Sequence, residues 1–272
     1  MTDHQSDTPV TDEDLVPGSI GPNLDGQVAV ITGGGRGIGR AIALGLAAAG
    51  ANVVPSARTA DEVETVAAQA RDIGVSAAGI TADVTDDNDV ETLVDETVSE
   101  FGGIDILVNN AGFNPADALG GPDDIESAAV DQVLDVNLRG AFRTVRAAGP
   151  QLVAADNGAV INIASVAGVV GLPRQHPYVA SKHGLVGATK SMALDWAPDV
   201  RVNAVAPGYV ATDLTEPVRE NESVHQSIID RTPLDRFASP AEMAGPVAFL
   251  ASDMATFVTG ETVAADGGWT AR

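Results

Sequence analysis

The chain has 272 residues, of which 38 are acidic and 15 basic, so its formal net charge at pH 7 is −23. A negative field of this size repels nucleic acids and anionic membranes, which we therefore exclude as partners. The absence of cysteine excludes disulfides, thiolate catalysis and zinc–thiolate sites. No apolar run reaches the ~20 residues of a membrane span, and no export signal is recognised, so a cytoplasmic protein is expected.

The first 22 residues are rich in aspartate, glycine and proline without periodic apolar positions, which predicts a flexible acidic arm over 1–22. We expect residues 23–272 to form a single dinucleotide-binding and catalytic domain, because no linker interrupts its alternation of strand and helix patterns. The predicted strands cover 28–31, 52–56, 76–81, 104–109, 159–164, 201–206 and 262–265. The predicted helices cover 37–49, 61–73, 87–101, 124–148, 178–196, 216–230 and 240–252. This alternation predicts an α/β fold of the Rossmann type, a doubly wound parallel sheet of about seven strands with helices on both faces.

A glycine-rich turn directly follows the first predicted strand and reads Thr32-Gly33-Gly34-Gly35-Arg36-Gly37-Ile38-Gly39. A strand, such a turn and a helix N-terminus together form an anion site, because the free backbone N–H groups point at a pyrophosphate. The spacing Gly33-x-x-x-Gly37-x-Gly39 differs from the Gly-x-Gly-x-x-Gly dinucleotide fingerprint. Taken alone, the turn is a weak indication that is also compatible with a tight connection binding no ligand.

Tyr178 and Lys182 stand out because tyrosine and lysine each occur only twice in the chain. On the helix predicted from 178 to 196, residues four apart share a face, so the ammonium can lie beside the phenol. A neighbouring cation favours the phenolate and would lower the pKa of Tyr178 from near 10 toward the range useful for general acid–base catalysis.

These motifs, with Asn109-Asn110-Ala111-Gly112, resemble the short-chain dehydrogenases/reductases over roughly residues 24–270. The resemblance implies an NAD(P)-dependent oxidoreductase that moves hydride between nicotinamide and a secondary alcohol or ketone. It implies that Tyr178 exchanges a proton with the substrate oxygen and that Lys182 lowers the pKa of Tyr178 and binds the nicotinamide ribose. The same resemblance implies that Ser165 holds the substrate oxygen and that Asn137 anchors a proton-relaying water.

The resemblance also implies a cofactor-binding set. Its members are Gly33, Gly35, Arg36, Gly37, Ile38, Gly39, Arg58, Asp83, Val84, Asn110, Ala111, Gly112, Tyr178, Lys182, Pro207, Gly208, Val210 and Thr212. NAD-specific relatives usually carry an acid where this chain has Ala57, and Arg58 follows. Together with Arg36, Arg58 would contact a 2′-phosphate, so NADP is the expected cofactor and NAD the alternative; Arg58 as a solvated surface charge is the competing interpretation. Pro55 lacks a donor for the sheet, which leaves the local strand geometry open.

The segments 169–172, 231–236 and 266–269 resemble the sugar and sugar-acid dehydrogenases, including gluconate 5-dehydrogenase-like and glucose 1-dehydrogenase-like enzymes of carbohydrate metabolism. The expected substrate contacts are Asn114, Arg174, Gln175, His176 and Tyr209, a polar set that suits a sugar, sugar acid or polyol. A 3-oxoacyl-thioester reductase acting on acyl carrier protein or coenzyme A is the alternative, and a catalytically silent dinucleotide sensor a remote one. No metal is expected, because the four histidines lack ligand spacing. The resemblance further implies a homo-oligomer, either a tetramer or a dimer.

The acidic composition is typical of proteins with a heavily hydrated surface from a salt-adapted, halophilic cytoplasm. Molar salt screens repulsion among the acidic side chains, so the melting temperature should rise as KCl increases from the millimolar to the molar range. Thermal unfolding followed across a KCl series checks this. A melting temperature that does not respond to salt would contradict the halophilic interpretation.

Overall fold

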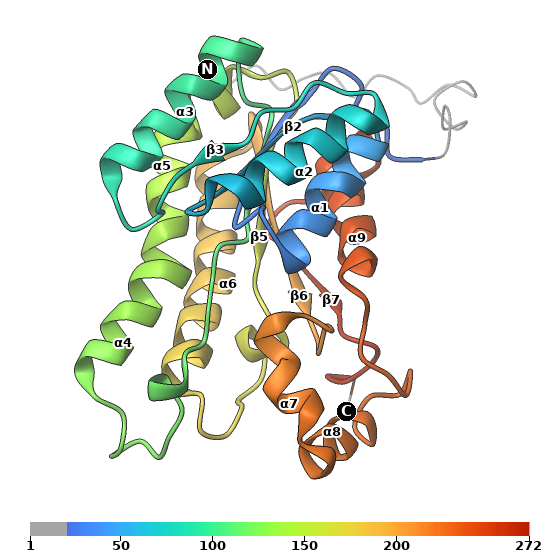
Figure 1. The fold of residues 1–272 in the computed structure, drawn as a ribbon. Helices are drawn as coiled ribbons and strands as arrows, with labels where there is room; N and C mark the ends of the chain where they lie inside the picture. Colours follow the sequence, from blue (N-terminus) through green and yellow to red (C-terminus); the bar gives the residue numbers. More distant parts are fainter. Residues whose placement is uncertain (1–20, 272) are drawn as a thin grey trace, which may run out of the picture.

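The computed structural model describes residues 21–271, so the arm predicted over 1–22 lies almost wholly outside the described residues. Seven parallel strands form one sheet in the order β3-β2-β1-β4-β5-β6-β7, with helices on both faces (Figure 1). The strands are β1 (Val28–Thr32), β2 (Asn52–Ala57), β3 (Ile80–Thr81), β4 (Ile106–Asn109), β5 (Gly158–Ile163), β6 (Val200–Pro207) and β7 (Thr262–Ala265). The predicted doubly wound α/β fold is confirmed.

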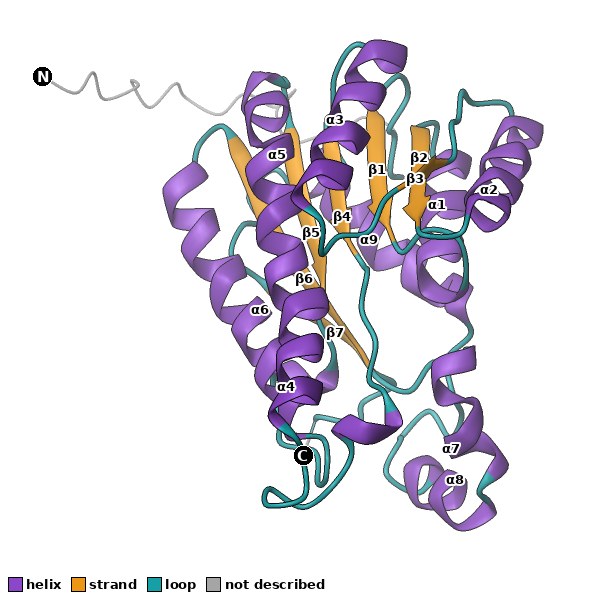
Figure 2. Cartoon of the chain, turned by 60° about the vertical axis from the view of Figure 1, so that its left-hand side comes forward, coloured by secondary structure: helices purple, strands orange, loops and turns teal. Residues whose placement is uncertain are grey.

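Helices cover both faces of the sheet (Figure 2). Those packed on one face are α1 (Gly37–Ala48), α2 (Ala60–Ile73) and α9 (Ala244–Ala251). Those packed on the other face are α3 (Asp87–Phe101), α5 (Gly140–Ala154) and α6 (His176–Trp196). Every residue of β1, β4, β5 and β6 is buried between the two layers, which is why these strands are nearly continuous apolar runs in the sequence.

Two further helices, α7 (Glu216–Glu220) and α8 (Glu222–Ile229), extend past the carboxyl ends of the strands (Figure 2). They replace the single helical segment predicted over 216–230, and Asn221 separates them by capping α8 with its side-chain oxygen. No helix within the described residues is long and apolar enough to cross a membrane.

The helix predicted over 124–148 has different bounds and contains an irregular turn. It begins at Ser127 as α4 (Ser127–Leu134), passes through a π-helical segment at Asp135–Arg139, and continues as α5 to Ala154. A π turn inserts an extra residue into the helical repeat and is frequent at functional sites. Here it carries Asn137, whose side chain is buried.

Pro55 lies inside β2 and explains why the strand predicted over 76–81 shortens to β3. The N–H of Val53 donates toward β3, to the carbonyl of Ser76, and position 55 faces the same side because alternate residues repeat the direction. Proline has no N–H to donate there, so regular pairing resumes only where Ser56 and Ala57 face β3. The pairing of β2 with β1 continues through Pro55 without a break.

A chain of buried polar side chains ties the elements of one face together. Thr144 on α5 donates its hydroxyl to Asn109 Oδ1 on β4 at 2.6 Å, and Asn109 Nδ2 donates to Asn162 Oδ1 on β5 at 2.9 Å. Asn162 Nδ2 then donates to the Thr189 hydroxyl on α6 at 2.9 Å, and this hydroxyl donates to the Leu185 carbonyl. The four side chains are at most 4% exposed, and the linked hydrogen bonds fix two helices relative to two strands.

Candidate active site

The candidate site lies at the carboxyl ends of the strands, where the order of the sheet reverses between β1 and β4. After β1 the chain runs outward through β2 and β3, and it then returns to form β4 on the other side of β1. Ligands of open α/β sheets bind in the crevice at such a switch point. Thr32 and Asn109, the last residues of β1 and β4, are the polar ends of these two buried strands.

The glycine turn is held in shape by the segment that follows β4. Asn110 Nδ2 donates to the carbonyls of Thr32 and Gly33 at 2.9 and 3.1 Å, and the Thr32 hydroxyl accepts the N–H groups of Asn110 and Ala111. Gly33 adopts a positive φ of 63°, and a Cβ on Gly39 would overlap the Gly33 carbonyl oxygen. The side chain of Asn110 therefore braces the turn, and the glycines let the backbone fold tightly on itself.

The N-terminus of α1 has the character of an anion site. Its N-cap, Arg36, makes no side-chain capping hydrogen bond, and the first turn holds no acidic residue. In the same acidic chain, α3 is capped by Asp86 and has Asp87 and Asp89 in its first turn. The first-turn N–H groups of α1 therefore keep their capacity for a ligand anion, and the residues present fit a pyrophosphate.

Arg58 and Arg36, the two cations expected near a 2′-phosphate, are each exposed and lie near a carboxylate. Arg58 lies 3.9 Å from Asp83, and Arg36 lies 3.6 Å from Asp213 in the segment after β6. Burial raises the pKa of Asp83, but hydrogen bonds from Thr85 and the charges of Arg58 and Arg143 outweigh it, so the net pKa is lowered. Asp83 therefore carries a negative charge beside Arg58 at neutral pH.

The sequence interpretation missed Glu62 at the same end of the site. This half-buried residue of α2 packs so closely against the glycine turn that a Cβ on Gly35 would lie 2.9 Å from its own Cβ. Only its place in the first turn of α2 could have indicated it, since Ala57 holds the position where an acid was sought. One carboxylate oxygen of Glu62 would lie 3.1 Å from the same added Cβ, so an acidic side chain adjoins the glycine turn.

Tyr178 and Lys182 lie on one face of α6, as predicted, with the Lys182 nitrogen 5.7 Å from the centre of the Tyr178 ring. Lys182 is 4% exposed, and Nζ donates to the Ile163 carbonyl at the end of β5 at 2.7 Å. The Ser165 hydroxyl is hydrogen-bonded to Tyr178 and also accepts the Ala167 N–H at 3.1 Å. Residues at and just after the end of β5 therefore contact both Tyr178 and Lys182.

The expected lowering of the Tyr178 pKa is not what this structure shows. Burial raises the pKa of Tyr178, the Ser165 hydrogen bond lowers it in part, and nearby Tyr209 raises it further. Burial also lowers the pKa of Lys182 from 10.5 to about 8. Lys182 is kept from water, Tyr178 is half-buried, and the ammonium faces a carbonyl, so desolvation exceeds the attraction that the i, i+4 spacing suggested.

Asn137 connects the π turn to this cluster. Its Oδ1 accepts the Phe113 N–H, and its Nδ2 donates to the Phe113 carbonyl at 2.9 Å and to the Ser181 hydroxyl at 3.3 Å. A Cβ on Gly112 would lie 3.3 Å from Asn137 Oδ1 and 3.6 Å from Lys182 Nζ, so both polar groups converge on this glycine. The structure therefore brings the four predicted catalytic side chains into one connected region.

Two of the expected substrate residues, Asn114 and Gln175, lie on segments that meet. Asn114 Nδ2 donates to Gln175 Oε1 at 3.0 Å, whereas Asn114 Oδ1 is buried without a hydrogen-bond partner. Arg174 has a φ of 61°, and its carbonyl accepts the Gly120 N–H. His176 is exposed at the first residue of α6.

The remaining cofactor candidates lie on three segments around the glycine turn. Thr212 packs against the turn, since a Cβ on Gly37 would lie 3.6 Å from its methyl group, and Val210 forms a bridge with Ala238. A Cβ on Gly208 would lie 2.8 Å from the Asp266 backbone. The other members, Ile38 on α1, Val84 after β3 and Pro207 at the end of β6, lie on elements of the same region.

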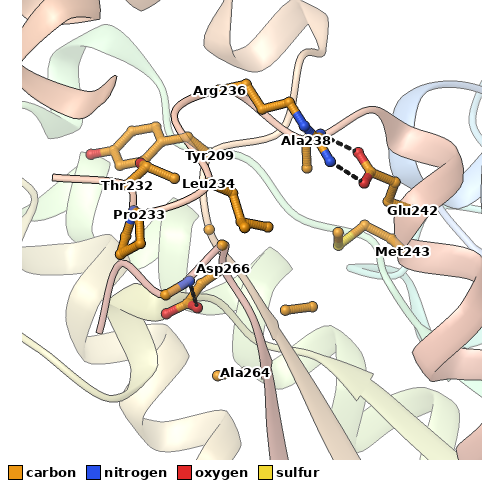
Figure 3. A pocket seen from close by; sticks show the side chains of 14 residues that line it. Tyr209, Thr232, Pro233, Leu234, Arg236, Ala238, Glu242, Met243, Ala264 and Asp266 are labelled. Atoms are coloured by element: carbon orange, nitrogen blue, oxygen red, sulfur yellow. Dashed lines mark hydrogen bonds and ion pairs between the residues drawn. The ribbon is translucent and has the colours of Figure 1, made fainter. Parts of the chain in front are cut away.

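Tyr209 forms one wall of a cavity of about 470 Å³ beyond the ends of β6 and β7. Its hydroxyl points away from the fork between Arg236 and Glu242 on the opposite wall (Figure 3). The ring meets Phe237 and Trp269 edge-on, with centroids 5.8 and 6.0 Å away. The sequence interpretation missed both aromatic contacts, because they come from segments remote along the chain.

Comparisons with known proteins agree with this geometry. The family model described as enoyl-(acyl carrier protein) reductase matches residues 33–270. A 3-oxoacyl-[acyl-carrier-protein] reductase of Staphylococcus aureus is 41% identical over 88% of this chain and 96% of its own length. The 2-dehydro-3-deoxy-D-gluconate 5-dehydrogenase of Escherichia coli is also 41% identical, over 92% of this chain and 98% of its own length.

A solved structure from Beutenbergia cavernae, described as a candidate NAD(P)-dependent gluconate 5-dehydrogenase with bound NADP, has a TM-score of 0.87 to this chain. It is 40% identical and covers 93% of this chain and 100% of its own.

The lowered pKa of Lys182 predicts how its replacement alters stability with pH. Below about pH 8 the folded protein bears the cost of burying a charged amine. From pH 8 to 10.5 it releases a proton that the unfolded chain still holds, so the cost is relieved. Lys182→Met removes this cost but also loses the hydrogen bond to Ile163. The net effect should be a free energy of unfolding about 2 kcal/mol higher near pH 7, and a smaller increase at pH 10.

Urea unfolding of the variant and the parent protein at pH 7, 9 and 10 measures this difference. Lys190→Met, at the exposed second lysine, is the control and should show no such dependence on pH. A difference between Lys182→Met and the parent protein that stays constant or grows toward pH 10 would contradict the assigned direction.

Proposed function

The chain belongs to the short-chain dehydrogenase/reductase family, and we propose that it interconverts a secondary alcohol and a ketone of a sugar, sugar acid or polyol with NADP. The observation that carries this proposal is the meeting of Tyr178, Ser165 and Lys182 beside a glycine turn suited to a dinucleotide. When bound, NADPH would supply the hydride for ketone reduction, and NADP⁺ would accept it in alcohol oxidation. The protein supplies position, a proton and electrostatic stabilisation.

Tyr178 is the proposed acid or base. Its raised pKa keeps the phenol protonated near neutral pH, ready to donate to a carbonyl oxygen during reduction. Ser165, hydrogen-bonded to the same phenol, would hold the substrate oxygen next to it. A carbonyl oxygen between these hydroxyls would accept a hydrogen bond from each, which favours the negative charge that develops there.

Lys182 and Asn137 are proposed to assist proton transfer at Tyr178. A protonated Lys182 favours loss of the Tyr178 proton during alcohol oxidation, because the positive charge stabilises the phenolate. Asn137 shares with Lys182 the space over Gly112, where the predicted water would join the amide to the amine. Proton exchange with solvent would then pass from Tyr178 through Lys182 to this water.

The preference for NADP rests on Arg58 and Arg36. Arg58 follows β2, whose neighbour β1 leads into the glycine turn, and a 2′-phosphate would compete with Asp83 for the Arg58 guanidinium. Glu62 opposes this preference in part, because its carboxylate lies against Gly35. NAD therefore remains the alternative cofactor, and a direct comparison of the two decides between them.

The substrate class rests on the polar mouth of the site and on the sugar-acid relatives. Asn114 and Gln175 present amide groups there, and the unpartnered Asn114 Oδ1 suits a hydroxyl donor. The alternative is reduction of a 3-oxoacyl thioester, favoured by the similarity to the Staphylococcus aureus reductase. An acidic carrier protein would meet repulsion from a chain of net charge −23, which weighs against that alternative.

We further propose a homotetramer working in carbohydrate metabolism in a salt-rich cytoplasm. Large apolar side chains lie exposed on α5 and α6, where Phe142 is 46% and Leu194 is 84% exposed. A second exposed pair, Met254 and Phe257, lies just before the edge strand β7. Two separate apolar surfaces are what a tetramer with two kinds of interface would cover.

Nicotinamide absorbance assays at low and molar KCl test the proposed reaction with NADP or NAD. The substrates are aldoses, aldonates, polyols and 3-oxoacyl thioesters. We expect turnover of sugars, sugar acids or polyols, and a loss of about 10²- to 10⁴-fold in Tyr178→Phe, which removes the exchangeable proton. Activity confined to thioesters would favour the alternative. Cofactor binding without any turnover would indicate a dinucleotide sensor.

Arg58→Gln tests the cofactor preference. Removing one charge-assisted contact to a 2′-phosphate should raise the KM for NADP about 10- to 100-fold and leave the KM for NAD nearly unchanged. Arg40→Gln, on α1 with a partner in Gln69, removes an arginine outside the site and should change neither value. Equal changes for NADP and NAD in Arg58→Gln would mean that Arg58 does not contact the 2′-phosphate.

A further inference from the structure

The guanidinium of Arg231 lies over the indole ring of Trp269. Its Cζ is 4.2 Å from the centre of the Trp269 ring, a stacked cation–π contact. Trp269 is only 5% exposed, so the surface under the guanidinium is fixed by packing. Stacking occupies the face of the guanidinium and leaves its N–H groups around the edge available to a planar, bidentate acceptor.

Arg231 is unusual among the arginines of this acidic protein. Several others in the described region pair with a carboxylate, such as Arg36 with Asp213, Arg143 with Asp135, and Arg236 with Glu242. Among the described residues, Arg231 has no carboxylate partner and no hydrogen-bond acceptor. With 38 acidic residues available in the sequence, a stacked guanidinium left without an anion suits a ligand anion.

Tyr209 connects Arg231 to the reacting groups. The Tyr209 ring meets Trp269 edge-on at 6.0 Å, so Tyr209 and Arg231 contact the same indole. Burial raises the pKa of Tyr209 and the charge of Arg231 lowers it in part, whereas Tyr209 in turn raises the pKa of Tyr178. The Arg231 guanidinium and the Tyr178 phenol therefore both interact electrostatically with Tyr209.

We propose that Arg231, stacked on Trp269, binds the carboxylate of a substrate whose reacting carbon lies at Tyr178 and Ser165. This inference rests on the proposed function and narrows it to hydroxy and keto acids of the sugar-acid class. Neutral polyols and thioesters, which lack the free carboxylate, would miss this contact. Arg174 is the rival cation, but no aromatic ring or ion pair among the described residues orients its side chain.

Kinetics with a matched substrate pair test the assignment, using D-gluconate against D-glucitol with NADP. Arg231→Gln should raise the KM for gluconate about 10- to 100-fold, with kcat within about threefold, and leave the constants for glucitol nearly unchanged. Arg231→Lys keeps the charge without the planar guanidinium, so its KM for gluconate should lie between those of Arg231→Gln and the parent protein. Arg40→Gln, which removes an arginine of α1 outside the site, is the matched control and should leave the constants for both substrates unchanged.

Fluorescence supplies a readout that does not require turnover. Trp196 and Trp269 are the two tryptophans, so Trp196→Phe leaves Trp269 as the sole reporter. Gluconate should change the Trp269 emission in this background, and the added Arg231→Gln should abolish that change. Arg231-dependent binding without oxidation of any sugar substrate would uphold the inference while the proposed function fails.

Two outcomes would overturn the assignment of Arg231. One is an unchanged KM for gluconate in Arg231→Gln, or an equal loss for gluconate and glucitol, while sugar oxidation by the parent protein leaves the proposed function intact. The other is the absence of both gluconate turnover and gluconate-dependent fluorescence in the parent protein.

Discussion

The proposed site depends on the buried hydrogen-bond chain that runs from Thr144 through Asn109 and Asn162 to Thr189. Each side chain in the chain forms a hydrogen bond with the next, so these polar groups occupy the core without the penalty of an unpaired donor or acceptor. The chain joins α5, β4, β5 and α6, and the proposed catalytic side chains lie on or beside these elements. The relative position of these elements is therefore set by directional bonds as well as by apolar packing, which tolerates small slips.

The distribution of charge differs between the surface of this protein and its candidate site. The surface is densely acidic, yet the first turn of α1 has no acidic residue, and the Lys182 amine is buried against a carbonyl. The helix terminus can attract a pyrophosphate because nearby carboxylates do not cancel its partial positive charge. At Lys182, burial brings the amine close to the pH at which it can exchange protons.

Much of the fold was predictable from the sequence because parallel strands buried on both faces must be apolar throughout. The strand predicted over 262–265 and the helix predicted over 87–101 agree with β7 and α3 residue for residue. The strand predicted over 76–81 was too long, since Pro55 on the neighbouring strand interrupts the pairing. The π turn around Asn137 was not predicted, because an extra residue in one turn scarcely alters the helical pattern of apolar positions.

The sequence predicted which side chains come together in the candidate site more accurately than it predicted their pKa values. The spacing of Tyr178 and Lys182 places both on one face of α6, but it cannot reveal the Ile163 carbonyl that receives the amine or the burial that raises the phenol pKa. Glu62 and Trp269 were missed for a similar reason. Their neighbours in space come from segments far away in the chain, so local sequence patterns carry no sign of these contacts.

The position of Tyr209 has a consequence for protein engineering. Its ring is wedged between Phe237 and Trp269, each edge contact contributing about 0.5–1.5 kcal/mol, so it can reorient only by giving up both. On one side the ring lines the cavity that Leu234 and Met243 also line, and its hydroxyl influences Tyr178. Substitution of Leu234 or Met243 would therefore shift the pKa of Tyr178, the proposed acid or base, through the tilt of the Tyr209 ring.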